Sequence, residues 1–259
     1  MCWSKFHLKK RVLDNKSDPK IPSGLQQAQA ESRARPVRSF VLRGGRLTEG
    51  QQRAMEELLP RYSVGDAAAC LDFSELFGNS RPVILEIGFG NGDATWQMAQ
   101  QQPAENFIGV EVHKPGVGHL LLQLQKLDIG NVRIACADGV EFLQQRIAAG
   151  SLAGLRLYFP DPWPKKRHHK RRIVQPDFVS LLAEKLSAGA ILHVATDWQD
   201  YAEFMLETLQ QNPAFENLSA TGNYCPRPPW RPLTKYEKRG QRLGHGVYDL
   251  LFQRRSDNR

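Results

Sequence analysis

The loop from Tyr158 to Arg172 joins a proline-rich turn that carries an acid to a block of positive charge. Three prolines alternate with Asp161 and Trp163, and each proline restricts its own φ and the conformation of the residue before it. Six cations within eight residues follow the turn, namely Lys165, Lys166, Arg167, Lys170, Arg171 and Arg172. A fixed carboxylate suits chemistry and a dense cationic block suits a polyanion. The loop is therefore predicted to serve catalysis and nucleic-acid binding together.

A second group of residues with chemical potential is the glycine turn at residues 86–92, Glu-Ile-Gly-Phe-Gly-Asn-Gly. It follows an apolar strand, so Gly88, Gly90 and Gly92 can bring backbone amides close to a ligand at the carboxyl edge of a sheet. The GxGxG spacing differs from the GxGxxG that binds a dinucleotide pyrophosphate. The charge of Glu86 also disfavours a phosphate and suits a cationic or amino group. These features predict a nucleotide-type pocket for a ligand other than a dinucleotide.

Two further acids follow strands of the same predicted sheet. Glu111 closes the second strand, where acids of such folds bind ribose hydroxyls, and Asp138 follows the third strand, where it could accept a hydrogen bond from an adenine amino group. Each acid alone could equally be a helix cap or a solvated surface group. Together with the glycines, the two acids favour recognition of an adenosyl group.

The elements that must position these residues alternate between strand and helix from Pro82 onward. Strands are predicted at 83–87, 106–111, 131–136, 154–159 and 190–196. Helices are predicted at 92–102, 176–187 and 198–210, and a further helix begins at Pro115. Gly189 is predicted to end the helix at 176–187. This order predicts an α/β fold with a doubly wound, mostly parallel sheet. Later strands are predicted at 215–220 and 247–254, and the second could add an antiparallel edge. A capping-box pattern at Thr48 predicts a helix to about Leu59.

Composition places these elements in one catalytic domain, residues 38–259, after a basic arm at residues 1–37 that is predicted to be flexible. The arm is either a solvated extension or an RNA-contacting segment. A net charge of +8 favours a polyanionic partner. The four cysteines have no zinc-site spacing, so no metal and reduced thiols are expected. No apolar run has the length of a membrane span and no signal-peptide core is present, which predicts a cytoplasmic protein without membrane contact.

Four motifs resemble those of the bacterial tRNA (guanine-N7-)-methyltransferases: the glycine turn at 86–92, the segment 159–172, Ala-Thr-Asp-Trp at 195–198, and Thr-Lys-Tyr-Glu-Lys-Arg-Gly-Gln-Arg-Leu-Gly-His-Gly at 234–246. The resemblance extends from about Arg38 to Arg254, and the arm matches no motif of the family. It implies a class I Rossmann-like fold dependent on S-adenosylmethionine, with a seven-stranded, mostly parallel sheet, an antiparallel edge strand and helices on both faces. It also implies tRNA as the partner and the guanine at position 46 of the variable loop as the target; a monomer and a homodimer both remain open.

The resemblance assigns roles to individual residues. It implies that the methyl donor is surrounded by Glu86, Gly88, Gly90, Gly92, Glu111, Asp138 and Asp161, and that the guanosine faces Lys165, Asp197, Thr234, Lys235, Tyr236 and Glu237. Asp161 and Asp197 are the expected catalytic residues. Guanine N7 already carries an in-plane lone pair, so an in-line transfer needs no general base. The enzyme must supply alignment and stabilisation of the positive charge that develops on the purine, which suits carboxylates.

Three alternatives are open at this point. An RNA-binding protein without catalysis would use the same basic loop, but it would not need the glycine turn with three acids at strand ends. A nicotinamide-dependent dehydrogenase could share the sheet, although the GxGxG spacing disfavours its pyrophosphate. A methyltransferase for an exocyclic amine typically has Asn or Asp followed by two prolines and an aromatic residue, and the sequence here at 160–163, Pro-Asp-Pro-Trp, is related but distinct.

Overall fold

The structure is a computed structural model that describes residues 39–40, 45–65, 69–234, 237 and 246–256. The basic arm expected at residues 1–37 lies outside the described residues, as do Lys235 and Tyr236. The boundary between arm and domain therefore stays a prediction. The described cysteines Cys70, Cys136 and Cys225 are free thiols.

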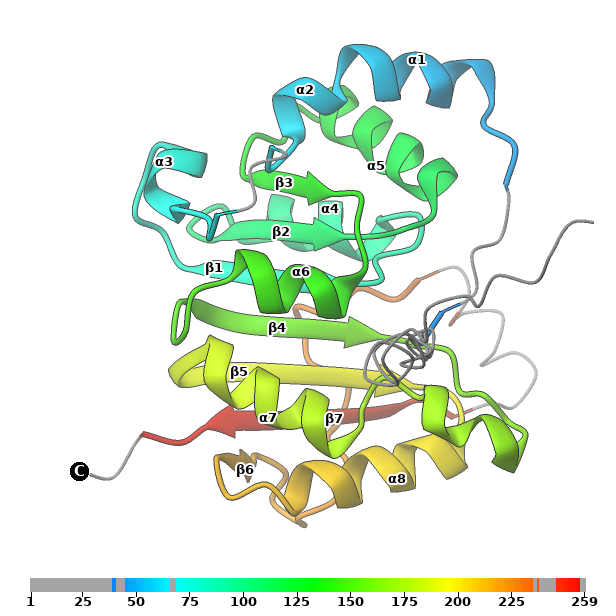
Figure 1. Ribbon diagram of the computed structural model, residues 1–259, viewed down its shortest axis with the longest axis vertical. Coiled ribbons are helices and arrows are strands. Elements are labelled where there is room, and N and C mark those ends of the chain that lie inside the picture. Colours follow the sequence, from blue (N-terminus) through cyan, green and yellow to red (C-terminus); the bar gives the residue numbers. More distant parts are fainter. Residues whose placement is uncertain (1–38, 41–44, 66–68, 235–236, 238–245, 257–259) are drawn as a thin grey trace, which may run out of the picture. The chain divides into compact units, whose positions relative to one another are not determined.

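Seven strands of the described residues form one sheet in the order β3-β2-β1-β4-β5-β7-β6 (Figure 1). Their bounds are β1 Val83–Ile87, β2 Asn106–Val110, β3 Val132–Ala135, β4 Leu152–Tyr158, β5 Leu186–Thr196, β6 Phe215–Asn217 and β7 Tyr248–Arg254. The pairs among β1 to β5 are parallel, and β7 runs antiparallel to both β5 and β6. The predicted α/β sheet and its antiparallel strand are confirmed, with the short β6 lying outside β7.

The helices of the described residues are α1 Glu49–Glu57, α2 Leu59–Tyr62, α3 Phe73–Phe77, α4 Asp93–Gln101, α5 Lys114–Lys126, α6 Gly139–Arg146, α7 Pro176–Lys185, α8 Gln199–Gln210 and the 3-10 helix η1 Lys166–Arg171. Several of them begin where the local sequence supplies a side-chain cap, as in α1, α3 and α6, or a proline, as in α2, α5 and α7. The predicted capping box of α1 is present, because the Thr48 hydroxyl accepts from the Gln51 backbone and the Gln51 side chain accepts from the Thr48 backbone. The short helices α2, α3, α6 and η1 were not predicted.

Helices cover both faces of the sheet, as expected (Figure 1). Alternate residues of β1 divide between two apolar cores, because successive side chains of a strand point to opposite faces. Val83, Leu85 and Ile87 pack in the core that includes residues of α6, α7 and α8. Ile84 packs in the core that includes residues of α1, α4 and α5. We call the second of these faces the α4 face.

The middle of the α4 face carries a row of buried ionisable side chains. Glu86 pairs in register with Arg156, and Arg156 pairs with His193, so the three residues are neighbours across β1, β4 and β5. All three are buried. A charge in this position requires partners, because burial of an unpaired charge is costly. This polar row lies beneath the edge of the sheet that carries the candidate site.

The prediction that Gly189 ends a helix is wrong. Helix α7 ends at Lys185, and β5 begins directly at Leu186. Gly189 instead has a φ of 82° inside β5. The pairing of β5 with β4 shifts there, since Leu152 pairs with Leu186 but Gly154 pairs with Ile191. Gly189 thus allows the backbone conformation that a β-bulge requires. The bulge arises from the pairing of two strands, so the local sequence does not predict it.

Candidate active site

A cavity of about 540 Å³ lies at the carboxyl ends of β1, β2 and β4. It brings together four of the residues predicted to bind the cofactor, Gly88, Gly90, Glu111 and Asp161. Apolar side chains complete the walls, among them Ile87, Val110, Ala137, Leu157, Phe159 and Ile173. We call this space the donor cavity. Its mixture of carboxylates, glycine backbone and apolar walls fits a ligand with both a polar and a flat apolar part.

The glycine loop has the backbone conformation that its sequence predicts. Gly88 and Gly90 have φ values of 72° and 58°, in a region of backbone conformation that residues with a side chain rarely adopt. The Gly88 amide donates to the Val110 carbonyl at 2.8 Å, and the Gly90 amide donates to Glu111 Oε2 at 2.8 Å. Gly92 also has a positive φ, 76°, but it begins α4 and lies against Leu120 of α5. The described lining of the donor cavity does not include it.

Glu111 ties the end of β2 to the glycine loop. Besides Gly90, its carboxylate accepts from the backbone amides of Val112 at 2.7 Å and His113 at 2.9 Å. A carboxylate has about four acceptor sites on its two oxygens, so these three bonds leave capacity for a further donor. Glu111 lines the donor cavity. A hydrogen bond from a ribose hydroxyl stays a prediction that this position permits.

Asp138 is the N-cap of α6, which is the alternative that the sequence left open. Its Oδ1 accepts from the amides of Val140 at 2.8 Å and Glu141 at 3.3 Å. Its chain neighbours Ala137 and Gly139 line the donor cavity, whereas Asp138 is not part of the described lining. Contact between Asp138 and an adenine amino group stays a prediction.

Glu86, which is predicted to contact the ligand, lies on the face of its strand away from the donor cavity, and that contact stays a prediction. Its side chain is on the α4 face, 3% exposed, and accepts from the Thr95 hydroxyl of α4 at 2.7 Å. The described lining of the donor cavity does not include it. Successive side chains of a strand alternate between the two faces of the sheet, so Ile87 lines the donor cavity while Glu86 points to the α4 face. Glu86 supports the site from beneath the glycine loop.

Burial raises the pKa of Glu86 to about 7, and the Thr95 hydroxyl and the Arg156 charge oppose this effect only in part. The folded state therefore binds a proton more tightly than the unfolded state. The contribution of Glu86 to stability is complete below about pH 4.5 and is lost as the pH rises through about 7.

The substitution Glu86→Gln is expected to remove this pH dependence. Between pH 5 and 8 the free energy of unfolding of the wild type should fall relative to that of the variant by about 2 to 3 kcal/mol. Urea unfolding of both proteins across this range measures the difference, and groups common to both proteins cancel. Two parallel stability profiles would show that Glu86 has an ordinary pKa.

Asp197 lies in a second cavity, of about 600 Å³, at the end of β5. Its other described lining residues are Trp198, Gln199, Asp200, Glu203, Gly246 and Tyr248. We call this space the β5 cavity. Tyr158 of β4 pairs with Ala195 of the parallel strand β5, and Asp161 and Asp197 lie three and two residues beyond this pair. The structure therefore places the two expected catalytic acids at the same edge of the sheet, in different cavities.

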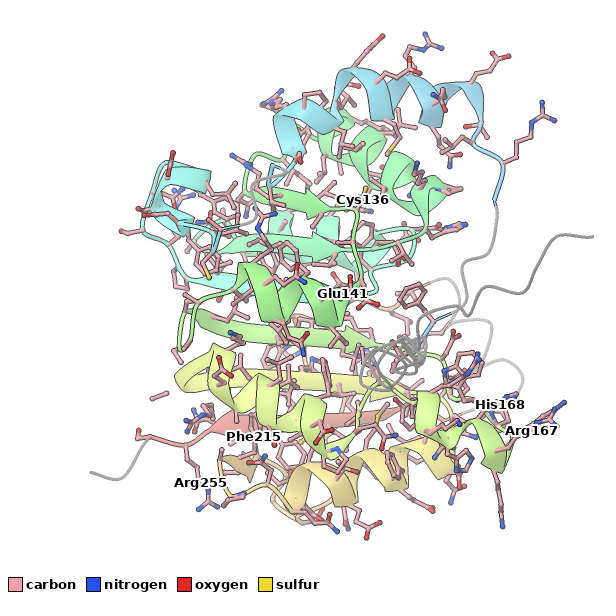
Figure 2. The ribbon with its side chains drawn as sticks, viewed as in Figure 1. Cys136, Glu141, Arg167, His168, Phe215 and Arg255 are labelled. Atoms are coloured by element: carbon pink, nitrogen blue, oxygen red, sulfur yellow. The ribbon has the colours of Figure 1, made fainter. Side chains whose placement is uncertain are left out.

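The basic segment folds into η1 beyond the carboxyl end of β4. Figure 2 shows Arg167 and His168 on the side toward which the arrow of β4 points, with Phe215 and Arg255 at the opposite end of the sheet. Lys165, Lys166, Arg167 and Lys170 are exposed. Lys165 precedes the helix and is in the described lining of neither the donor cavity nor the β5 cavity. These cations are available to a polyanion at the edge of the sheet that holds both cavities.

Arg172 is the exception in the charge block, because it turns inward and is 2% exposed. Its Nε donates to the Pro162 carbonyl at 2.9 Å, its guanidinium pairs with Asp200, and it lies 4.8 Å from the centre of the Tyr201 ring. Arg172 thus fastens the proline turn to α8. Its inclusion among the cations that face a polyanion is wrong.

Trp163 also has a structural role. It has a φ of 46°, and its indole N–H donates to the Ser39 carbonyl at 3.0 Å. The Arg171 guanidinium lies 4.8 Å from the centre of the indole ring, and His168 meets the ring edge-on. Ser39 and Phe40 in turn line the donor cavity. The sequence analysis did not identify this contribution of residues 39–40, and no local pattern there signals it.

Glu237, which is predicted to face the guanosine, is buried at 4% exposed, and its contact with a guanosine stays a prediction. Arg231 Nη1 donates to its Oε2 at 2.6 Å, and Arg231 Nη2 donates to its Oε1 at 2.9 Å. The Glu237 amide donates to the Thr234 hydroxyl at 3.2 Å. Arg231 was missed by the sequence analysis. The polar residue Asp249 at an inward position of the apolar strand β7 was the signal that a buried cation must lie nearby.

Gly116 of α5 is a further residue that sequence reasoning missed. A Cβ at this position would lie 2.0 Å from the carbonyl oxygen of Gly90. The helix therefore approaches the glycine loop more closely than any side chain allows. A glycine two residues into a helix, directly after Pro115, was the available signal.

None of the helices among the described residues combines the length and the apolar character needed to cross a membrane. Within the same part of the chain, no three His, Cys, Asp or Glu residues are grouped in a way that could hold a metal ion.

Comparisons with known proteins find relatives over most of the chain. A family model described as "Putative methyltransferase" matches residues 80–250. The tRNA (guanine-N(7)-)-methyltransferase of Aeromonas hydrophila is 56% identical over 220 residues, which cover 85% of this chain and 93% of the relative.

Solved structures of methyltransferases share the fold at low sequence identity. The 16S rRNA methyltransferase KamB matches with a TM-score of 0.54 and 17% identity, covering 76% of this chain and 99% of KamB. The 16S rRNA (adenine(1408)-N(1))-methyltransferase of Catenulisporales acidiphilia, solved with its cosubstrate SAM, matches with a TM-score of 0.50 and 14% identity, covering 76% of this chain and 97% of that protein. At these identities the likeness concerns the fold alone.

Proposed function

This chain belongs to the bacterial tRNA (guanine-N7-)-methyltransferase family, and we propose that it transfers the methyl group of S-adenosylmethionine to N7 of the guanine at position 46 in the tRNA variable loop. The observation that carries the proposal is the donor cavity, where Gly88, Gly90, Glu111 and Asp161 meet next to an exposed basic segment. The close approach of the backbone at the glycines and the strand-end acids suit an adenosyl ligand, and the cations suit RNA.

The donor cavity fits S-adenosylmethionine. We assign the glycine loop and Glu111 to the polar part of the donor, and the apolar walls from Ile87, Val110 and Ala137 to its purine. Asp161, in the same lining, would face the cationic part. When bound, this cofactor supplies an electrophilic methyl group on a sulfonium. Glu86, Gly92 and Asp138 support the loop and the helix starts around the cavity.

On the substrate side, the chain's carboxylates supply alignment and electrostatic stabilisation. Guanine N7 accepts a methyl group without losing a proton, so no residue needs to act as a general base. Positive charge develops on the purine during an in-line transfer, and a nearby carboxylate stabilises it. We assign this role to Asp197, which is exposed at the end of β5, and we place Asp161 between donor and substrate. We also assign Lys165, Thr234 and the residues that follow it in the sequence, Lys235 and Tyr236, to the guanosine side.

The direct test combines purified protein, labelled S-adenosylmethionine and unmodified tRNA. Cleavage of the product at N7-methylguanosine should occur at position 46, and a tRNA with adenosine at that position should accept no label. Label at another guanine would contradict the proposed site. Label on a different base atom would contradict the proposed reaction, and a protein that binds tRNA without transferring label would support the binding-protein alternative.

The exposed cations of the basic segment are expected to bind tRNA phosphates. Replacing Lys165, Arg167 and Lys170 with alanine should weaken tRNA binding and make the slope of log affinity against log salt shallower by about 2 to 3, since each phosphate contact contributes about 0.7 to 0.9. Filter binding between about 50 and 200 mM salt measures this slope.

A matched control removes the same charge from the other end of the sheet. Arg81, Lys126 and Arg255 are exposed, and their replacement with alanine changes the net charge equally. This control should leave the slope close to that of the wild type. Equal changes in both triple variants would mean that the total charge, and not the basic segment, determines tRNA binding.

A further inference from the structure

A buried polar cluster lies on the α4 face, apart from both cavities. It consists of His193 in β5, Asp249 in β7, and Arg231 and Glu237 in the segment between β6 and β7. All four residues are buried, with Arg231 only 1% exposed. None of them belongs to the described lining of the donor cavity or the β5 cavity. The function proposed above does not use them.

Arg231 is the centre of the cluster. Its Nε donates to Asp249 Oδ1 at 2.7 Å and its Nη2 donates to Asp249 Oδ2 at 2.9 Å. The two nitrogens at the other side of the guanidinium, Nη1 and Nη2, donate to the two oxygens of Glu237. The guanidinium thus forms two forked pairs at once. A planar fork with five donors can do this, whereas the ammonium of lysine cannot.

His193 fastens this cluster to the sheet. It shares a hydrogen bond of 2.7 Å between Nε2 and Asp249 Oδ1, and one of 3.0 Å between Nδ1 and the Tyr158 hydroxyl. Burial lowers the pKa of His193 to about 4, so the imidazole is neutral at physiological pH and Arg231 is the cation that balances the acids. The Trp230 indole also donates to His193 Nδ1, at 3.3 Å.

The cluster connects the two sides of the proposed reaction. At one end, Tyr158 and Phe159 line the donor cavity, and the Arg231 guanidinium lies 5.7 Å from the centre of the Phe159 ring. At the other end, the amide of Glu237 is bonded to the Thr234 hydroxyl. A continuous path of hydrogen bonds therefore runs from the wall of the donor cavity to Thr234.

A contribution to the stability of the fold does not by itself explain why such a cluster is present. A buried ion pair often contributes less to stability than apolar side chains of the same volume, because both charges lose their hydration. Its forked geometry does fix the relative positions of the segments that it joins. Here those segments are the end of β4, the strand β7, residues 230–234 and Glu237.

We propose that Arg231 is a positioning residue: paired with Asp249 and Glu237, it holds Thr234 at a fixed distance from the Phe159–Asp161 turn, and so sets the guanosine against the methyl donor. This inference rests on the proposed function. It also replaces the expected contact between Glu237 and guanine, because Glu237 acts through Arg231. Misplacement of a bound substrate by about 1 Å can cost about 100-fold in rate, so a change in the geometry of the cluster is expected to lower the rate of the turnover step.

The test compares Arg231→Lys, which keeps the charge but loses the fork, with the wild type. We expect kcat for tRNA methylation to fall by about 10- to 100-fold, while the KM for tRNA and the calorimetric Kd for S-adenosylhomocysteine each change less than about threefold. Arg255→Lys is the control, because Arg255 is exposed at the opposite end of the sheet (Figure 2). It should have wild-type kinetics.

Glu237→Gln provides a second variant that keeps the shape of the side chain and leaves Arg231 paired with Asp249. It should fold even if Arg231→Lys does not. Its kcat should also fall, while the KM for tRNA and the Kd for S-adenosylhomocysteine again change less than about threefold. In the variant that carries both changes, the loss should be no larger than that of the more damaged single variant, since both changes break one pair.

Several results would overturn the inference. An unchanged kcat in Glu237→Gln would do so, and so would a loss of S-adenosylhomocysteine binding in step with activity, which would indicate a general structural role. Additive losses in the double variant would mean that Glu237 contacts the guanine independently of Arg231. A wild-type protein that transfers no methyl group to unmodified tRNA would instead refute the proposed function, which makes the two failures distinguishable.

Discussion

Replacing Asp197 with alanine is expected to lower kcat for tRNA methylation by about 100-fold or more, because the variant lacks the carboxylate that we assign to the developing positive charge on guanine. The interaction strengthens only as that charge develops, so kcat should fall further than the KM for tRNA rises. Asp197 lies in the β5 cavity and not in the described lining of the donor cavity. The Kd for S-adenosylhomocysteine, measured by calorimetry, should therefore stay at its wild-type value.

Glu203→Ala is the matched control for this experiment. Glu203 lines the same cavity, is exposed, and carries the same charge. Its carboxylate accepts a hydrogen bond from Gln199 at 2.9 Å, one turn of α8 away. Its removal should change kcat less than about threefold, as expected for an exposed charge that solvent screens. Full activity in Asp197→Ala would remove Asp197 from the catalytic assignment, and equal losses in both variants would indicate a general effect of charge in the cavity.

The second large effect is expected from Gly116→Ala. The added Cβ would lie 2.0 Å from the Gly90 carbonyl oxygen, a backbone atom that cannot move without moving the glycine loop. Such overpacking costs about 1 to 3 kcal/mol of stability. It should also break the hydrogen bond between the Gly90 amide and Glu111. We therefore expect the Kd for S-adenosylhomocysteine to rise at least about tenfold, since loss of one such bond and its alignment costs roughly 1.4 kcal/mol or more.

Gly50→Ala separates this effect from the general consequence of adding a methyl group to a helix. A Cβ at Gly50 in α1 would meet no atom within 4 Å. Alanine should there stabilise the protein by up to about 1 kcal/mol and leave donor binding unchanged. Calorimetry is performed at a temperature where circular dichroism shows both variants to be folded. Wild-type donor affinity in Gly116→Ala would show that the loop can shift without loss of the cavity.

Much of the sheet follows from local patterns. Alternating apolar strands and helices predicted the parallel strands, and β1 was predicted with its observed bounds, Val83–Ile87. The bulge at Gly189 was not predictable, because it depends on how β5 pairs with β4 and not on the residues around the glycine. The short helices α2, α3, α6 and η1 have too few turns to show an apolar period.

For the candidate site, too, some features were predictable from the sequence and others were not. Gly88, Gly90, Glu111 and Asp161 were predicted together and line one cavity, because strand ends in a parallel sheet meet at one edge. The partners of charged groups could not be predicted. Arg172 resembles its basic neighbours in the sequence but pairs with Asp200, and Glu237 resembles an exposed acid but pairs with Arg231.

The sequence by itself determined the class of the fold, the glycine turn, the acids at the strand ends and the basic segment, because each depends on residues close together in the chain. Only the tertiary structure decided which charged side chains face the cavities and which are buried. Glu86, Arg172 and Arg231 turn inward because partners in α4, α8 and β7 compensate their loss of hydration, and Glu237 is buried against Arg231. Those partners are brought into contact by the fold, so the direction of each side chain is a property of the packed molecule.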